Sequence, residues 1–228
     1  MTDLVSYERA DRIATITMDD GKVNVFSIPM LKALHAAFDQ AERDKAVVIL
    51  TGRPGYFSAG FDLKVFQQDR DTILEMLNLG AGLAERILTF PTPVVAACSG
   101  QGYPAGAFLM LASDVRIGIQ GPYAIGLNEV RIGLTVPWFA IELARHRLLP
   151  AWFDRCVNTS TMCGPDDAVT AGFLDRVVEA DHLLAASREA AKELTKLDPA
   201  AYVGTKLRVR GRAIEALRAG IESELTVA

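Results

Sequence analysis

The chain has 228 residues, of which 50% are hydrophobic and 23% are charged, and its formal net charge is −4. A chain of this length buries roughly 70–75% of its unfolded surface, so it can form a core without disulfides or metals. The mildly acidic balance, without a run of five like charges, argues against nucleic-acid and anionic-membrane partners. Its apolar stretches fall well short of the ~20 residues that a membrane helix needs. Because the N-terminus is acidic and no signal-like apolar region follows it, we expect a cytoplasmic protein.

Cysteine and histidine spacing gives no sign of a metal site. The three cysteines form no Cys-x-x-Cys pair, so we expect buried, reduced thiols at Cys98, Cys156 and Cys163. The histidines lack the paired spacing of a metal-binding helix and lie in separate predicted helices, at His35, His146 and His182. We therefore predict no metal and no separate cofactor.

Strands and helices alternate along most of the chain. Period-two patterns and short apolar runs predict strands over 5–9, 13–18, 46–51, 94–98 and 114–119, the first two as a hairpin. The uninterrupted apolar run 46–51 indicates a strand buried on both faces, as in a parallel sheet. Helical spacing predicts helices over 28–43, 72–88, from about 104, and over 138–148, 167–171, 182–197 and 202–225. This order favours the α/β class with a helical C-terminal region.

Two glycine-bearing loops follow buried strands, over residues 57–64 and 99–108. Loops at the carboxyl ends of parallel strands are where α/β folds place ligands. Glycine lets backbone N–H groups approach a ligand, so the two loops could supply two donors to one developing oxyanion. The alternative is that the glycines only permit tight turns. The run from Gly100 to Gly106 lacks the spacing and the acidic partner of a dinucleotide site, which disfavours nicotinamide binding.

Glu129 is the candidate acid or base. It stands in the largely apolar segment 125–137, where a desolvated carboxylate would have a raised pKa and act as a general base. The alternative is an exposed loop glutamate that pairs with Arg131, because most glutamates lie on the surface.

Three motifs together resemble the crotonase family, also known as the enoyl-CoA hydratase/isomerase superfamily. Residues 58–64, Ser-Ala-Gly-Phe-Asp-Leu-Lys, resemble the first oxyanion-hole loop of that family, and residues 100–114 resemble the second. Residues 126–133 contain its Gly-x-x-Glu-x-x-x-Gly pattern, and residues 166–178 are similar to a later family segment. The resemblance covers nearly the whole chain.

The resemblance implies a crotonase-like spiral of ββα units over residues 1–180 and a helical region over 181–228 that packs at subunit contacts. It also implies a homotrimer or a dimer of trimers. The ligand would be an acyl-CoA thioester, with coenzyme A as part of the substrate. The chemistry would be a thioester enolate held by two backbone N–H groups, one from Phe61 and the other from Ala105 or Gly106. By the same match, substrate contacts fall on Ala59, Gly60, Asp62, Leu63, Lys64, Phe108 and Trp138.

The chain departs from the family's hydratases at Phe108. Those enzymes carry two glutamates, and the first of the two positions is Phe108 here, while Glu129 keeps the second. A phenyl ring neither holds nor deprotonates water, so the resemblance favours a Δ3,Δ2-enoyl-CoA isomerase that uses Glu129 as its single acid and base. The alternatives are an enoyl-CoA hydratase and a non-catalytic acyl-CoA-binding protein.

Other side chains are weaker candidates. Basic groups bind phosphate well, so the CoA phosphates could meet Lys64, Lys206, Arg208, Arg210 and Arg212, although a solvated basic helix face is the simpler interpretation. Aromatic side chains could line an acyl pocket, at Phe66, Trp138 and Phe139, although core packing is the alternative.

Overall fold

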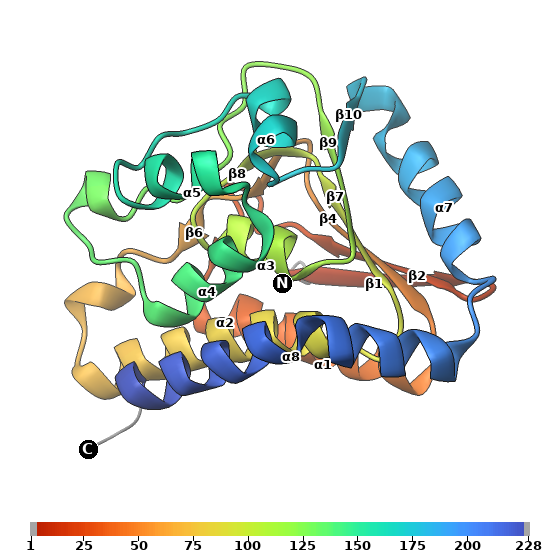
Figure 1. Cartoon of the computed structure of the whole chain (residues 1–228), viewed down its shortest axis with the longest axis horizontal. Helices are drawn as coiled ribbons and strands as arrows, with labels where there is room; N and C mark the ends of the chain where they lie inside the picture. Colours follow the sequence, from red (N-terminus) through yellow and green to blue (C-terminus); the bar gives the residue numbers. More distant parts are fainter. Residues whose placement is uncertain (1–3, 226–228) are drawn as a thin grey trace.

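The structure, a computed structural model, describes residues 4–225 (Figure 1). Its main sheet has six strands in the order β1-β2-β4-β7-β9-β10. β1 and β2 pair antiparallel, and the other neighbours are parallel. The bounds are β1 Val5–Ala10, β2 Ile13–Met18, β4 Val47–Gly52, β7 Val94–Cys98, β9 Val115–Ile119 and β10 Arg176–Val178. The predicted hairpin and the three later strands are confirmed within one residue at each end, whereas β10 was not predicted as a strand.

Strand β4 is buried on both faces of the sheet, as its uninterrupted apolar run predicted. Val48 and Leu50 point into the larger core, which also contains side chains of the helices on that face. Val47 and Ile49 point into a smaller core on the opposite face, together with Leu183. The alternation follows from the two-residue period of a strand.

Two short parallel pairs connect the loops that follow the strands. β3 (Val25–Phe26) pairs with β6 (Gly60–Phe61), and β5 (Gly55–Ser58) pairs with β8 (Gly100–Gly102). These pairs were not predicted, because strands of two to four residues are too short to show a hydrophobic period. The pair β5-β8 joins the two glycine-bearing loops, and β3-β6 joins the first of them to the segment that follows β2.

Eight α-helices surround the sheet in the described part of the chain (Figure 1). They are α1 Ile28–Arg43, α2 Arg70–Thr89, α3 Ala105–Ala112, α4 Trp138–Arg147, α5 Pro150–Val157, α6 Pro165–Ala171, α7 Leu183–Leu194 and α8 Pro199–Glu224. Short 3-10 turns are η1 Val65–Gln67, η2 Val130–Ile132 and η3 Ala180–His182. Within residues 4–225, no helix combines the length and the apolar character needed to cross a membrane.

Side-chain caps explain why two helices begin earlier than predicted. The Asp69 carboxylate accepts a hydrogen bond from the backbone N–H of Thr72 at 2.9 Å, so α2 begins at Arg70 rather than at residue 72. The Asp198 carboxylate accepts from the N–H of Ala201 at 2.8 Å, so α8 begins at Pro199 rather than at residue 202. Such caps satisfy N–H groups that a helix start leaves without acceptors.

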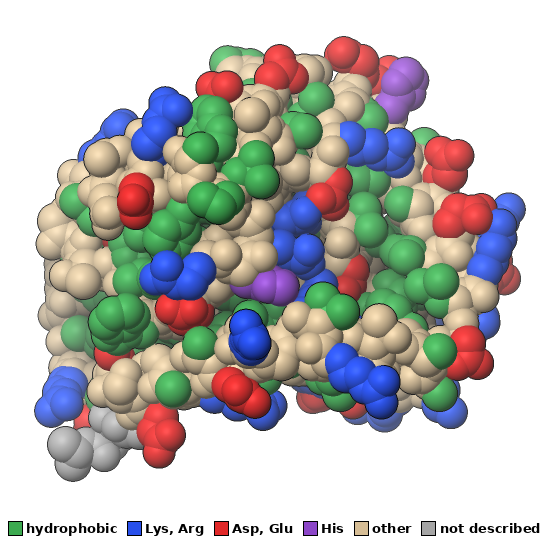
Figure 2. Space-filling view, viewed as in Figure 1, with side chains coloured by type: hydrophobic (Ala, Val, Ile, Leu, Met, Phe, Trp, Pro, Cys, Tyr) green, Lys and Arg blue, Asp and Glu red, His purple; other side chains and the backbone are tan. Residues whose placement is uncertain are grey.

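Helix α8 crosses α2 and α4 and buries two basic side chains. Lys206 and Arg210 are each 6% exposed, and both contact the carboxylate of Asp114, at 3.0 and 2.8 Å. The interpretation of these two residues as a solvated basic face is therefore wrong, whereas phosphate binding by them stays a prediction. Figure 2 shows basic and histidine side chains gathered above α8, where a cavity of about 470 Å³ contains Asp114, His146, Arg147 and Tyr202 in its wall.

Candidate active site

A mostly apolar cavity of about 260 Å³ lies where the two glycine-bearing loops meet the segment after Asn128. Its polar side chains are few and come from Tyr103, Asn128, Glu129 and Thr135. The apolar part of its wall consists of Ala59, Phe61, Leu63, Phe66, Leu77, Pro104, Phe108, Ile132, Leu134 and Pro137. An apolar pocket with a few converging polar groups is the usual form of a small-molecule site.

The first loop turns sharply at Gly60. This residue has a φ of +93°, and a Cβ there would lie 2.2 Å from Cδ of Pro104. Only glycine tolerates both the left-handed backbone and this close approach. The Ser58 hydroxyl fixes the turn, since it accepts from the N–H of Gly60 at 3.1 Å and donates to the carbonyl of Asn24 at 2.7 Å. Gly60 thereby brings the backbone of Phe61 against the second loop.

The second loop leads directly into α3. The N–H of Tyr103 donates to the carbonyl of Ser58 at 3.0 Å, which ties the second loop to the first. Gly106 makes a close approach, because a Cβ there would lie 3.0 Å from the carbonyl oxygen of Ser58. The N–H of Phe108 donates to the carbonyl of Pro104, at 3.2 Å, so Ala105 and Gly106 stand in the first turn, where helical N–H groups have no helical acceptor.

Glu129 is buried in the cavity wall without a partner. Its side chain is 4% exposed, and neither carboxylate oxygen has a hydrogen-bond partner within residues 4–225. Burial raises the pKa of Glu129 from 4.5 to about 7. The alternative of an exposed glutamate paired with Arg131 is wrong, because the Arg131 guanidinium donates to the carbonyl of Ser160 instead, at 3.2 Å.

Phe108 faces the same cavity as Glu129. Its ring is 2% exposed and packs in a T-shaped contact on Phe139, with ring centroids 5.4 Å apart, and at 6.4 Å from the ring of Phe61. An apolar ring thus occupies the place where the resemblance puts the hydratases' first glutamate. Among the described residues that line the cavity, Glu129 is the only carboxylic acid.

The other expected substrate contacts are divided between the cavity and the surface. Ala59 and Leu63 line the cavity, and Gly60 is buried behind them. Asp62 accepts from the backbone N–H of Lys64 at 3.0 Å, and the Lys64 side chain is exposed. Neither of these two belongs to the cavity wall.

The three aromatic candidates for the acyl pocket also lie in different places. Phe66 lines the cavity, whereas Phe139 lies behind Phe108 in the core. Trp138 is 52% exposed at the start of α4 and packs beside Gly220 of α8, away from the cavity wall.

Sequence reasoning missed several residues of the wall. Ile132, Leu134, Thr135 and Pro137 lie within the segment already singled out around Glu129, whose largely apolar composition was the available signal. Leu77 comes from α2, and its spacing does not distinguish a cavity side chain from a core side chain.

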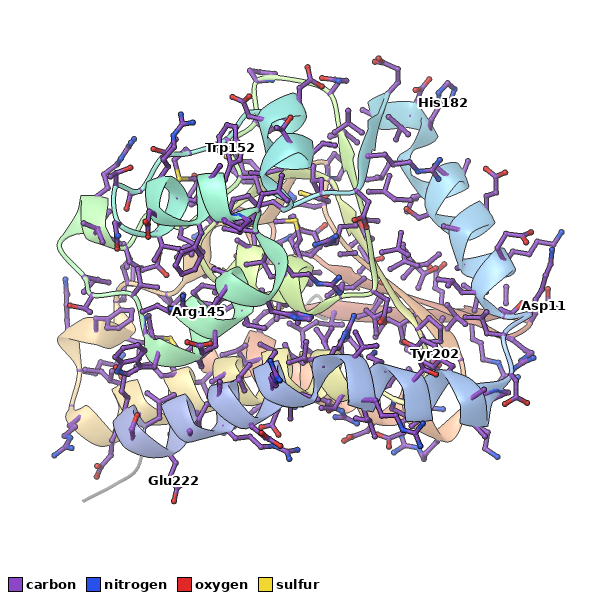
Figure 3. All side chains as sticks on the ribbon, in the orientation of Figure 1. Asp11, Arg145, Trp152, His182, Tyr202 and Glu222 are labelled. Carbon is purple, nitrogen blue, oxygen red and sulfur yellow. The ribbon has the colours of Figure 1, made fainter. Side chains whose placement is uncertain are left out.

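The histidines lie outside the cavity wall. The His35 ring contacts the carbonyl of Leu79 at 3.0 Å. Burial lowers the pKa of His146 to about 4. Figure 3 shows His182 at the beginning of α7, well apart from α4 and α5.

Comparison with known proteins gives a family for this fold and site. The family model described as enoyl-CoA hydratase/isomerase matches residues 8–228. The chain belongs to this enoyl-CoA hydratase/isomerase family. A crystal structure of an enoyl-CoA hydratase/isomerase family protein from Pseudomonas syringae superposes with a TM-score of 0.96 and 45% identity, over 98% of this chain and 97% of that one. The crotonase fold and the family expected from the resemblance are therefore confirmed.

Similar proteins are named both as isomerases and as hydratases. Enoyl-CoA delta isomerase 1 of mouse mitochondria is 28% identical over 81% of this chain, and a probable enoyl-CoA hydratase of Bacillus subtilis is 34% identical over 56% of it. The similar regions cover 66% of the mouse protein and 50% of the Bacillus protein. Family membership alone thus does not decide between isomerase and hydratase activity.

Proposed function

We propose that this protein isomerises 3-enoyl-CoA thioesters to 2-enoyl-CoA thioesters, with Glu129 as its single acid and base. The observation that carries the proposal is the buried Glu129 carboxyl, which has no hydrogen-bond partner and faces Phe108 rather than a second acid. A carboxyl with a pKa of about 7 is suited to both accept and return a proton near neutral pH.

The reaction needs one proton to move between two carbons. The Glu129 carboxylate takes a proton from C2, and the electron pair of that C–H bond delocalises into the thioester carbonyl to give an enolate. The C3–C4 double bond then takes up the proton at C4 from the Glu129 carboxyl, and a C2–C3 double bond forms. No atom is gained or lost from the substrate, so one carboxyl suffices.

The enolate oxygen needs donors that are already in place. The backbone N–H of Phe61 is one proposed donor, and that of Ala105 or Gly106 is the other. Support comes from the contact between the loops at Gly60 and Pro104, and from the place of Ala105 and Gly106 in the first turn of α3. A helix N-terminus also favours negative charge at this point.

Hydration is the alternative within the same family. It requires a group that activates water besides the group that handles the C2 proton, and Phe108 offers none. The hydroxyls of Tyr103 and Thr135 in the cavity wall can hold a water molecule, which keeps this reaction as the competing outcome.

Incubation with each enoyl-CoA in deuterated water separates the candidates. We expect 3-enoyl-CoA to become 2-enoyl-CoA with deuterium on carbon and without added water, as measured by mass spectrometry. Glu129→Gln should abolish this conversion while acyl-CoA binding survives, and Glu193→Gln, at an exposed glutamate, should leave it unchanged.

The other outcomes overturn the proposal. Addition of water to 2-enoyl-CoA without isomerisation supports the hydratase. Binding of acyl-CoA without turnover of any enoyl ester supports a non-catalytic acyl-CoA-binding protein.

The resemblance also leads us to propose a homotrimer, single or paired. Light scattering of the purified protein tests it, because the protomer has a mass of 24.7 kDa. A monomer mass would contradict the proposal.

A further inference from the structure

Two buried thiols lie together outside the cavity. Cys156, near the end of α5, is 0% exposed and Cys163, just before α6, is 1% exposed. Their Sγ atoms are 3.8 Å apart, and both cysteines are free thiols. The third cysteine, Cys98, makes a separate contact from its Sγ to the carbonyl of Gly100, at 3.2 Å. Trp152, which is labelled in Figure 3, belongs to α5 and marks the position of this helix.

Two backbone hydrogen bonds connect Cys163 to the segment that carries Glu129. The N–H of Cys163 donates to the carbonyl of Ile125 and the N–H of Ile125 donates to the carbonyl of Cys163, both at 2.9 Å. Ile125 also forms a parallel bridge with Gly102 of the second loop. Cys163 is therefore linked to the segment that carries Glu129 and, through Ile125, to the second loop.

The residues between the two cysteines support the same segment. The Ser160 hydroxyl accepts from the backbone N–H of Arg131 at 3.3 Å, and the Ser160 carbonyl accepts from its guanidinium at 3.2 Å. Met162 packs against Gly126, where a Cβ would lie 3.2 Å from its Sδ. Glu129 thus lies in the sequence between Gly126 and Arg131, and both of these residues contact the segment between the two cysteines.

The short connection between the two cysteines, residues 157–162, is held in a fixed conformation. Ser160 is held in the left-handed region with φ +48°, and the N–H of Thr161 donates to the carbonyl of Arg155 at 3.1 Å. A disulfide needs a separation of about 2 Å between the sulfurs. Closing the gap from 3.8 Å must therefore move the end of α5, the connection or Cys163 itself.

We propose that Cys156 and Cys163 form a reversible disulfide on reaction with a peroxide, and that this disulfide lowers the activity of the Glu129 site. The second half of this inference rests on the proposed function, while the first half does not. The cysteine pair is then a modification site whose co-reactant is hydrogen peroxide.

The step is balanced as a two-electron oxidation. The Cys156 thiolate attacks one peroxide oxygen, the O–O bond breaks, and a sulfenic acid and hydroxide form. The Cys163 sulfur then attacks the Cys156 sulfur, the S–O bond breaks, and the oxygen leaves as water once protonated. Two thiols lose two electrons and two protons, and one peroxide becomes two waters.

The environment favours Cys156 as the sulfur that reacts first. The contact between the two thiols lowers the pKa of Cys156 and raises that of Cys163. Asn158 and Thr159, beside the pair, are exposed, so local opening at the end of the eight-residue helix α5 admits a small oxidant.

Peptide masses give the decisive test of the disulfide. Trypsin cleaves after Arg155 and Arg176, which places both cysteines in one peptide, residues 156–176, and Cys98 in another, residues 87–116. After hydrogen peroxide and then alkylation, we expect peptide 156–176 to be lighter by two hydrogens and unalkylated, with Cys98 alkylated. Dithiothreitol should return both cysteines of the first peptide to the alkylated form.

Activity of the same samples tests the effect on the site. We expect the isomerisation rate to fall at least tenfold on oxidation and to recover with dithiothreitol. Cys156→Ala and, as a second variant, Cys156→Ser should keep their rate in peroxide. Cys98→Ala should remain as sensitive as the unmodified protein.

Two results would overturn the inference. Alkylation of both cysteines in peptide 156–176, or oxygen located by fragmentation on Cys156 or Cys163 rather than on Met162, excludes the disulfide. A complete cross-link with an unchanged rate excludes the link to the site. If no enoyl-CoA is turned over, the proposed function fails, yet the peptide masses still decide whether the disulfide forms.

Discussion

At the scale of single residues, Glu129 combines burial with the absence of any partner. A buried polar group without a hydrogen bond costs roughly 1–3 kcal/mol, so such groups are uncommon in folded proteins. Glu129 remains in this state because the surrounding segment holds it, through Ile125, Gly126 and Arg131. The same environment raises the pKa of Glu129 to a value at which a carboxylate can act as a base near neutral pH.

The rate should therefore depend on pH through Glu129. Since the base must be ionised and its pKa is raised to about 7, kcat/KM should fall about tenfold per pH unit below that value and level off above it. A pH profile of kcat/KM for 3-enoyl-CoA, which reports the free enzyme, measures this. An inflection near the ordinary glutamate pKa of about 4.3 would contradict the assignment.

At the scale of elements, α2 leaves room for the ring of Phe61 at a single glycine. A Cβ on Gly80 would lie 2.5 Å from Cε1 and 2.6 Å from Cζ of Phe61, whereas a Cβ on Gly82 would meet nothing within 4 Å. The helix therefore contributes to the site by the absence of a side chain, although Gly80 itself does not line the cavity.

Gly80→Ala should displace the Phe61 ring and lower kcat/KM by about tenfold to a hundredfold, because small misplacements in a site are costly. Gly82→Ala is the matched control, and it should raise the free energy of unfolding by roughly 0.5–1 kcal/mol with an unchanged rate. Steady-state kinetics and urea unfolding of both variants measure these effects. Equal kinetics for the two variants would show that the ring adapts without consequence.

Two positively charged side chains of helix α8 bind backbone carbonyls at the C-terminal ends of α2 and α3. Lys206 donates to the carbonyl of Phe90 at 3.1 Å, after the end of α2, and Arg210 donates to the carbonyl of Ala112 at 3.2 Å, at the end of α3. Cations are favourable at helix C-termini, and Asp114 supplies the remaining negative charge.

Asp114→Asn should lower the free energy of unfolding by about 3 kcal/mol or more, because it leaves two buried cations without their carboxylate. Lys196→Ala removes the exposed ion pair with Glu193 and should cost less than about 1 kcal/mol. Urea titrations at neutral pH compare the two. A cost for Asp114→Asn no larger than that of the exposed pair would show that the helix carbonyls alone satisfy both cations.

At the scale of the whole molecule, the two C-terminal helices complete two different cores. Leu183 and Ala191 of α7 cover one face of the main sheet. Ile214 and Leu217 of α8 belong to the larger core on the other face. Helices α7 and α8 are therefore part of the packing of the chain, whatever further contacts they make with other subunits.

Residues 1–180 alone should not unfold cooperatively. Without α7 and α8, apolar side chains of both cores are exposed to water, among them Ile49 and Val95 of the sheet. Circular dichroism during heating should show one sharp transition for the full chain and a broad, shallow one for the fragment. A sharp transition for the fragment would instead establish residues 1–180 as an independent folding unit.

Features that depend on neighbours along the chain could be predicted from the order of the residues. Hydrophobic period and length located the strands of the hairpin, β4, β7 and β9, and glycine spacing located the two loops. The motifs around Phe61 and Glu129 led to the family, and the lack of an acid at Phe108 was visible in the residue itself. These signals are local, so no tertiary information was needed to find them.

Which of these features meet in space depends on the tertiary structure. The short pairs β3-β6 and β5-β8 have no periodic signature, yet β5-β8 joins the two loops and β3-β6 joins the first loop to the segment after β2. The burial of Glu129, of Lys206 and of Arg210, and the position of Trp138 outside the cavity, depend on segments distant in sequence. Local patterns encode the period of an element, whereas charge pairing and burial follow from which surfaces pack together.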